Sequence, residues 1–364
     1  MATNNTNGFE HTKPSVSIAT DTHPATTVLV LDAPDALDIN ASRDAQKPVS
    51  PFQRALKLLR HDKRALFGLS VLFLFVVIAL AGPPIYQHIG GTYQGDLTGP
   101  IGPAVYHQYA HGELSQQDEL PSARYWLGTD SVGRDILARL MQGLLISLTV
   151  AVTVEVVNVT LGLFIGVLAG FYGGWIDFLL ARFTDLMFAF PSLLFAILLV
   201  GVFGSSANLF LSNVPLFGDP GNARLLVVSI ALAFTSWPMM ARYVRGQTLQ
   251  IKEAQFIEAS QASGTKTARL IIQHIIPHLL SIIFIISTLD IAGTITGEAG
   301  ISLLGLGVSD PGSSLGLMIA DSLDLADSHP WEVLVPTLAL TIIVLAFSFL
   351  GDSLRDAFDP RSRR

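Results

Sequence analysis

The chain has 364 residues and a formal net charge of −7; 50% of its residues are hydrophobic and only 14% are charged. Soluble domains carry about 25% charged residues, so this composition points away from a soluble protein if the apolar residues form long blocks. The sequence has no cysteine, which excludes disulfides, thiolate catalysis and cysteine-ligated metal or iron–sulfur sites.

The first 50 residues are rich in Thr, Asn, Asp, Pro and Ala, and we predict that they form a disordered cytoplasmic tail. They contain no apolar stretch of the kind found in a cleavable signal peptide, so the first span is expected to act as an uncleaved signal anchor. A basic segment, PFQRALKLLRHDKRA, follows at residues 51–65. Its position just before the first apolar block places that end of the block in the cytoplasm.

Six apolar blocks follow, and each is close to the roughly 20 residues that a helix needs to cross a bilayer. The fold class predicted from them is an all-α integral membrane protein with six transmembrane helices. Prolines 191, 238 and 336 interrupt the third, fourth and sixth blocks, where kinks are expected. The blocks are Ala65–Ala81, Leu144–Leu168, Leu186–Phe203, Leu225–Met240, Leu279–Thr296 and Val333–Leu350.

The basic residues outside the blocks predict the orientation. With the N-terminus inside, the flanks on the cytoplasmic side hold fifteen Lys and Arg residues and the external flanks hold four. This asymmetry favours an N-in, C-in arrangement. The segment between blocks four and five is then cytoplasmic, and the region Gly82–Gly143 is external.

The cytoplasmic segment EAQFIEASQASGTKTARLIIQHIIPH covers Glu253–His278 and has the pattern of two short helices. Gly264 stands where a residue in the left-handed region would end the first helix. Thr265 or Thr267 is suited to cap the second, and Pro277 is suited to the first turn of the next span. On physical grounds alone, an amphipathic connector at the membrane interface is an equally acceptable interpretation.

The residues Glu258-Ala259-Ser260, followed by Gly264 and Ile276-Pro277, resemble the EAA motif of the permease subunits of bacterial ABC importers. Serine stands at the third motif position in place of the usual alanine, and the motif ends in IIP. In that family the loop is a coupling helix that docks into a cleft on a cytoplasmic ATPase. The resemblance therefore assigns an ATPase-coupling role to these six residues.

Three further stretches resemble the C-type subunit of the dipeptide/oligopeptide/nickel permease family. They are WLGTDSVGRDILARLMQG (Trp126–Gly143), GEAGISLLGLGV (Gly297–Val308) and LGDSLRDAFDPR (Leu350–Arg361). The sequence departs from the family at SSLG (313–316), where a tryptophan usually precedes the glycine. The resemblance covers residues 52–361 and implies an N-terminal permease region at 51–110, with span 1 and the start of the external loop, and a transmembrane domain at 111–364 with spans 2–6.

The resemblance implies the partners of the chain. They are a homologous B-type permease, one or two cytoplasmic ATPase subunits that bind ATP and Mg²⁺, an extracytoplasmic substrate-binding protein and the lipid bilayer, with no nucleic acid. The chain itself is then neither an enzyme nor a cofactor-binding protein, and its location is the inner or plasma membrane of a bacterium or archaeon. Peptides are the main cargo of the family, although nickel, glutathione or an oligosaccharide remains open.

Acidic residues within the blocks are costly and are by default functional. Glu155 and Asp290 within the blocks, and Glu298 near the end of the fifth span, are candidates to line a hydrated translocation path; the alternative is that each is satisfied inside the helix bundle. Asp185 has the neighbouring Arg182 as a partner in that second interpretation.

Other motifs are interpreted as structural. The segment LGTDSVGRD (127–135) contains Asp130, Arg134 and Asp135, and we predict a turn with Arg–Asp pairing rather than a metal or phosphate site. The segment HIIPH (274–278) lacks the glutamate of HExxH, and SGTKT (263–267) lacks P-loop spacing, so neither a zinc site nor an ATP site is predicted.

Two other classes of protein are alternatives. An ion-coupled secondary transporter that needs no ATPase would have inverted repeats with broken helices, and the two halves of the sequence show no convincing repeat. An intramembrane hydrolase needs paired catalytic groups at membrane depth. Here all histidines lie outside the six blocks, and the intramembrane acids occur singly.

Overall fold

The computed structural model describes residues 57–89, 108–211 and 222–358. The predicted tail at 1–50, the start of the basic segment and the last residues of the LGDSLRDAFDPR motif lie outside this range. Within the described residues the chain is helical, and the only β-pairing there is two isolated bridges, Gly112 with Arg134 and Thr129 with Asp135. The all-α class that the composition predicts is therefore observed in the described part of the chain.

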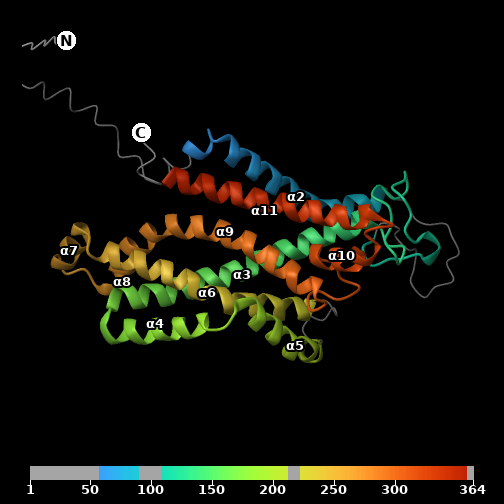
Figure 1. The fold of residues 1–364 in the computed structure, drawn as a ribbon. Coiled ribbons are helices and arrows are strands. Elements are labelled where there is room, and N and C mark those ends of the chain that lie inside the picture. The colour runs from blue at the N-terminus through green and yellow to red at the C-terminus, as the bar shows by residue number, and fades with distance from the viewer. Residues whose placement is uncertain (1–56, 90–107, 212–221, 359–364) are drawn as a thin grey trace, which may run out of the picture. The chain divides into compact units, whose positions relative to one another are not determined.

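Figure 1 shows long helices that run alongside one another. Five helices of the described part are long and apolar enough to cross a membrane, and α4 with α5 makes a sixth span if the bent pair is counted as one. The α-helices are α2 (Lys63–Ile89), α3 (Ile136–Tyr172), α4 (Gly174–Phe188), α5 (Ser192–Leu211), α6 (Asn222–Lys252), α7 (Gln255–Ala262), α8 (Thr267–Leu270), α9 (Ile276–Leu303), α10 (Leu315–Ser322) and α11 (Pro330–Phe358).

The third apolar block is broken at Pro191, where the sequence predicts a kink. Its first residues close α4, the chain turns at Pro191, and its remainder belongs to α5; the two helices meet at an angle of 78°. Proline has no N–H to continue a helix and disfavours helical geometry at the preceding residue, so a sharp break here has a clear cause. Pro238 and Pro336, in contrast, lie inside α6 and α11, which continue through them.

The helices at the predicted external region are also longer than their apolar blocks. Helix α2 continues past Ala81 through Pro83 and Pro84, and α3 begins at Ile136, eight residues before the block. Asp135 caps α3, since its side chain accepts hydrogen bonds from the backbone N–H groups of Leu137 (2.8 Å) and Ala138 (3.2 Å). Helices α2 and α3 therefore extend into the region that the sequence predicts to be external.

Helices α3 and α6 pack in close contact because α3 presents glycines four residues apart. A Cβ at Gly166 would lie 2.7 Å from both the Ala241 carbonyl oxygen and Val244 Cβ, and one at Gly170 would lie 2.7 Å from Thr248 Cβ. Small residues at this spacing let two helix backbones approach, which is a common device in membrane bundles. The α3–α6 pair therefore forms the centre of the bundle.

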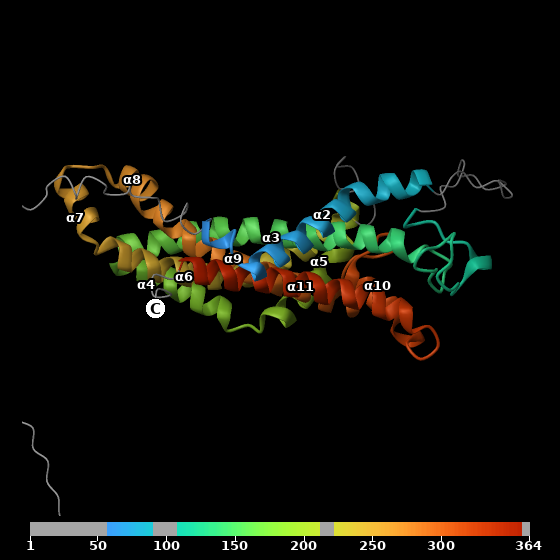
Figure 2. The same ribbon diagram turned by 90° about the horizontal axis from the view of Figure 1, so that it is seen from above.

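The two ends of the bundle differ in character. In both views α7 and α8 lie at one end, and α10 lies at the other (Figures 1 and 2). We call residues 108–135 together with α10 the cap. The beginning of α2 and the end of α11 are linked by an ion pair between Arg64 and Asp356 at 3.1 Å. In the core between these two helices, Leu72 and Ala79 pack with Ile343 and Ala346.

Candidate functional site

The segment between α6 and α9 forms a helical elbow. Helix α7 ends at Ala262, Gly264 follows with φ of +78°, and α8 starts at Thr267. The left-handed backbone predicted at Gly264 is therefore confirmed. A Cβ at this glycine would meet nothing within 4 Å, so glycine is needed here for its backbone conformation and not for space.

The second helix of the elbow starts differently from the prediction. Its N-cap residue is Lys266, and no side chain caps it. Thr265 instead accepts a hydrogen bond from the Ser260 hydroxyl (3.1 Å), which ties the two sides of the turn together. The expectation that Thr265 or Thr267 caps the helix is wrong. The hydroxyl of Thr265 is hydrogen-bonded to Ser260 within the turn, and Thr267 is already the first residue of α8.

Buried apolar side chains hold the elbow against the long helices. Ile257 of α7 and Ile275 are fully buried and share a cluster with Val244 of α6 and Phe171 of α3. Burial of one such side chain stabilises a structure by about 1.5–3 kcal/mol. The elbow is therefore part of the packed core on one side.

The other side of the elbow is exposed and carries small side chains. Glu258 and Ala259 are exposed, and Ser260 is partly buried. The ring of Phe256 stacks on that of His278, with 5.1 Å between their centroids, and so links α7 to α9. A surface of short side chains on a rigid turn allows another surface to approach closely.

The last two motif residues lie at the junction with α9. Residues Ile271–Ile275 form a π-helical turn, and Ile276 and Pro277 are the first two residues of α9. Pro277 takes the position predicted from the sequence, in the first turn of α9. The π-turn was not predicted, and such turns are frequent at functional sites.

A cavity of about 740 Å³ opens on the side of the bundle between the α4–α5 bend, α6 and α9. Its lining includes Pro191 at the bend, Ser236 of α6 and Asp290 of α9. One carboxylate oxygen of Asp290 is buried and accepts no hydrogen bond. Asp290 therefore places a carboxyl group at a cavity large enough for a small ligand.

The other two predicted path residues occupy different surroundings. Glu155 of α3 is buried beside Ser287 and Asn158, without a hydrogen bond of acceptable geometry, and is close enough to Asp290 for the two carboxylates to interact. Glu298 is fully buried and accepts hydrogen bonds from Ser147 (2.9 Å) and Ser302 (2.6 Å). The structure thus brings Glu155 and Asp290 together, and it places Glu298 in a separate serine-lined position.

Two ion pairs join α4 to α6. Arg242 donates to Asp185 at 2.7 Å and lies over the ring of Phe188, and Arg245 pairs with Asp177. Asp185 was expected to pair with Arg182, and that contact is present but longer, at 3.8 Å. The closer partner on α6 could not be seen from sequence distance alone.

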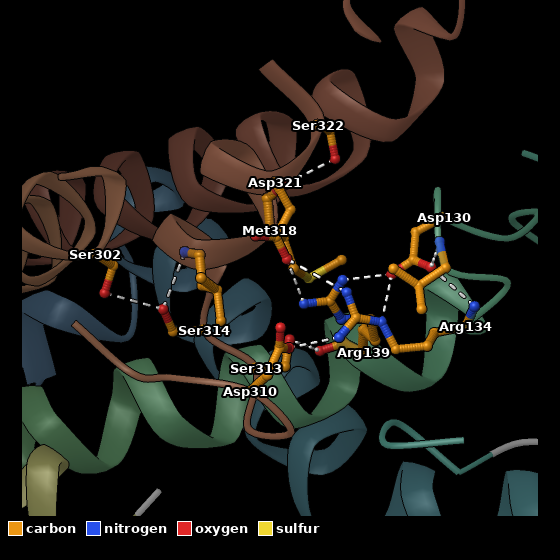
Figure 3. Close-up of polar contacts among 12 residues, drawn as sticks. Asp130, Arg134, Arg139, Ser302, Asp310, Ser313, Ser314, Met318, Asp321 and Ser322 are labelled. Carbon is orange, nitrogen blue, oxygen red and sulfur yellow. Dashed lines mark hydrogen bonds and ion pairs between the residues drawn. The ribbon is translucent and has the colours of Figure 1, made fainter. Parts of the chain in front are cut away.

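The segment LGTDSVGRD forms the Arg–Asp pairing that its sequence predicts (Figure 3). Asp130 is buried, and it accepts hydrogen bonds from Arg134 (2.8 Å) and Arg139 (2.5 Å). These arginines also reach Asp310 (2.5 Å) and Asp321 (2.9 Å), so the network joins the loop to α3 and α10. Burial by itself would raise the pKa of Asp130, but the two guanidiniums and two backbone N–H groups lower it below its ordinary value of 3.8.

Comparison with known proteins agrees with this arrangement. Residues 162–364 match the family described as binding-protein-dependent transport system inner membrane component. Residues 50–100 match the N-terminal TM domain of oligopeptide transport permease C.

Individual relatives cover most of the chain. The dipeptide transport system permease protein DppC of Alkalihalophilus pseudofirmus is 34% identical over 320 residues, which is 88% of this chain and 93% of the relative. The oligopeptide transport system permease protein OppC of Bacillus subtilis is 33% identical over 325 residues, 89% of this chain and 94% of the relative. OppC of Salmonella typhimurium is 35% identical over 314 residues, 86% of this chain and 92% of the relative. The chain therefore belongs to the family of inner membrane components of binding-protein-dependent transport systems, and within it to the permeases that resemble DppC and OppC.

Proposed function

We propose that the chain is one of two homologous permease subunits of an ATP-driven importer in a bacterial inner membrane, and that its cargo is di- or oligopeptides. Its partners are a B-type permease, one or two cytoplasmic ATPases that bind ATP and Mg²⁺, and an extracytoplasmic binding protein. The names of its relatives support the cargo, since they are dipeptide and oligopeptide permeases. Catalysis belongs to the ATPases.

The observation that carries this proposal is the elbow α7–Gly264–α8. One side of it is fixed in the core by Ile257, and the other exposes Glu258 and Ala259 at the end of the bundle. A rigid turn of this kind transmits a push from a docked ATPase into α6 and α9, which are its direct continuations. Since α6 and α9 both line the cavity that contains Asp290, movement of the elbow changes the shape of the cavity.

The orientation proposed is six spans with both termini in the cytoplasm. The bent pair α4–α5 counts as the third span in this arrangement. The Arg64–Asp356 ion pair supports it, because it joins the start of α2 to the end of α11. Both of these ends lie toward the end of the bundle that carries the elbow (Figure 1).

The proposal is tested by purifying the chain from its native membrane in mild detergent and identifying the accompanying subunits by mass spectrometry. Ala259→Leu places a large side chain on the exposed face of α7 and is expected to abolish ATPase association. Ala326→Leu is the matched control, since Ala326 is also exposed but lies next to the cap. Gly264→Val is expected to behave as Ala259→Leu, whereas Gly264→Asn retains the ATPase because asparagine tolerates the left-handed region.

Equal recovery of the ATPase with all four variants would contradict a coupling role for the elbow. Recovery of the chain alone, able to move solute into liposomes without ATP, would instead establish an ion-coupled secondary transporter.

A further inference from the structure

Three side chains with metal-binding groups meet where the cap contacts the start of α11. They are Asp118, from the loop after the short 3₁₀ helix Leu114–Gln116, and His329 and Glu332, at the start of α11. One ligand atom from each lies within 4.8 Å of the other two. The loop residue is held in place by a hydrogen bond from its own backbone N–H to the Asp130 carbonyl (3.2 Å).

Glu332 is buried in this cluster without a hydrogen-bond donor. Its relative exposure is 2%, and neither of its carboxylate oxygens has a hydrogen-bond partner. Oδ1 of Asp118 is also buried and has no hydrogen-bond partner. A buried carboxylate costs several kcal/mol unless a counter-charge or donors compensate it. Two carboxyl groups in this position are stabilised either by a proton that they share or by a bound cation.

The charged side chains nearby do not supply that cation. Asp130 adds a further negative charge within electrostatic reach of Glu332, and Arg139 adds a positive one. Arg139, however, donates to Asp130 and Asp321, and no bond to Glu332 is among its contacts. The helix dipole at the first turn of α11 favours a negative charge, but by only about 0.3–1 kcal/mol.

The histidine is oriented as in known metal sites. His329 Nδ1 lies 3.1 Å from the hydroxyl of Ser328, and that hydroxyl donates to the Leu325 carbonyl (3.3 Å). With its proton committed to Leu325, the serine oxygen accepts a hydrogen bond from Nδ1–H. This contact occupies Nδ1 and leaves Nε2 as the ring nitrogen that can bind a metal.

We infer that Asp118, His329 and Glu332 bind a divalent transition-metal cation, with Zn²⁺ as the best match and Mn²⁺ next. Two carboxylates neutralise its charge, and an imidazole selects Zn²⁺ and its neighbours over Ca²⁺ and Mg²⁺, which prefer oxygen ligands alone. In a tetrahedral site, Zn–ligand distances of about 2.0–2.2 Å place the ligand atoms about 3.3–3.6 Å apart, so the three side chains move closer together around the ion. Water completes the coordination. The bound cation links the cap loop to α11.

The test is Zn²⁺ binding to the full chain, purified with its natural subunits through a tag without histidine and stripped of metal beforehand. Binding is measured by equilibrium dialysis, together with the melting temperature. Wild type is expected to bind one Zn²⁺ at this site and to melt at a higher temperature with Zn²⁺. Glu332→Gln and His329→Ala are expected to weaken Zn²⁺ binding by about tenfold or more. Neither variant should show the rise in melting temperature on addition of Zn²⁺.

His111→Ala is the matched control, because His111 lies in the cap outside the cluster, and it is expected to bind Zn²⁺ as wild type does. Without metal, Glu332→Gln is expected to melt no lower than wild type, since it removes a buried charge. An unchanged or higher melting temperature would show that Glu332→Gln is folded, so its weaker Zn²⁺ binding would result from the loss of a ligand.

Equal Zn²⁺ affinity in wild type, Glu332→Gln and His329→Ala would overturn the inference, since the metal would then be bound elsewhere. Absence of Zn²⁺ and Mn²⁺ binding by wild type would overturn it as well. In that case a higher melting temperature of Glu332→Gln would identify a pair of carboxyl groups that share a proton. The test is independent of the transport role.

Discussion

Arg64 and Asp356 form an ion pair at 3.1 Å across 292 residues of sequence. Both side chains are more than half exposed, so the pair contributes at most about 1 kcal/mol to stability. Its significance is topological. The beginning of the first long helix and the end of the last lie at the same end of the bundle, which requires an even number of crossings between them.

The first prediction concerns this topology and uses the absence of native cysteine. Ser263→Cys places a thiol on the exposed surface of the elbow, and Ser115→Cys places one on the exposed surface of the cap. A membrane-impermeant thiol reagent added to intact cells is expected to label the cap cysteine and not the elbow cysteine. In inverted membrane vesicles the pattern should reverse. Labelling of both from the same side would contradict the six-span, N-in, C-in arrangement.

The second prediction concerns the contact between α3 and α6. Gly166→Ala adds a Cβ that would lie 2.7 Å from the backbone oxygen of Ala241, which cannot move without shifting α6. Overpacking of this kind costs about 1–3 kcal/mol, and we expect a lower melting temperature in detergent. Gly246→Ala in α6 is the control, because nothing lies within 4 Å of its added Cβ. It should leave the melting temperature unchanged or raise it.

The elbow shows which features of a structure can be predicted from residues that are neighbours in the sequence. The left-handed backbone at Gly264, the position of Pro277 at the start of α9 and the small exposed side chains of α7 could be predicted, because each depends on the residue itself and its immediate neighbours. The capping of the second helix could not. Thr265 is engaged by Ser260 across the turn, and this contact depends on the three-dimensional path of the chain.

The membrane-spanning part shows the limit of hydropathy. The kink expected at Pro191 is present, but hydropathy carries no measure of its size, and the structure bends there by 78°. The glycines 162, 166 and 170 are spaced for close helix packing, and this signal was available in the sequence. The cluster of Asp118, His329 and Glu332 was not visible, since its members are separated by about two hundred residues.

The third prediction concerns pH and the cap. The two arginines lower the pKa of Asp130, so its ionised form is favoured by the folded state. Its contribution to stability is then fully present above the unfolded pKa of about 3.9, and it is lost as the pH falls through the lower folded pKa. Asp130→Asn is expected to destabilise the protein at pH 7 by about 3 kcal/mol, because it leaves Arg139 with one carboxylate partner fewer.

The measurement is the melting temperature of wild type and Asp130→Asn between pH 7 and pH 3. The difference should be constant from pH 7 to about pH 5 and should shrink below about pH 4. Asp324→Asn serves as the control, since Asp324 is exposed in the short helix after α10. A difference that does not change with pH would mean that packing, and not the charge of Asp130, accounts for the loss.

The last prediction separates two intramembrane carboxylates. Asp290 lines the cavity, and Glu298 is enclosed with three serines nearby. Peptides with a free N-terminus carry an ammonium group with a pKa of about 7.7–8.0, which a carboxylate in the path attracts. Asp290→Asn is therefore expected to lower peptide uptake roughly tenfold, which corresponds to about 1.4 kcal/mol, without lowering the melting temperature.

Glu298→Gln should give the opposite result. Glutamine keeps one acceptor oxygen, but its amide nitrogen cannot accept the second of the two hydrogen bonds that Ser147 and Ser302 donate, so a loss of about 1–3 kcal/mol in stability is expected with uptake per folded molecule unchanged. Comparing a free with an N-acetylated peptide sharpens the test, because the effect of Asp290→Asn should be confined to the free peptide. An equal loss for both peptides would assign Asp290 to the shape of the cavity and not to its charge, and unchanged uptake of both would remove Asp290 from the path.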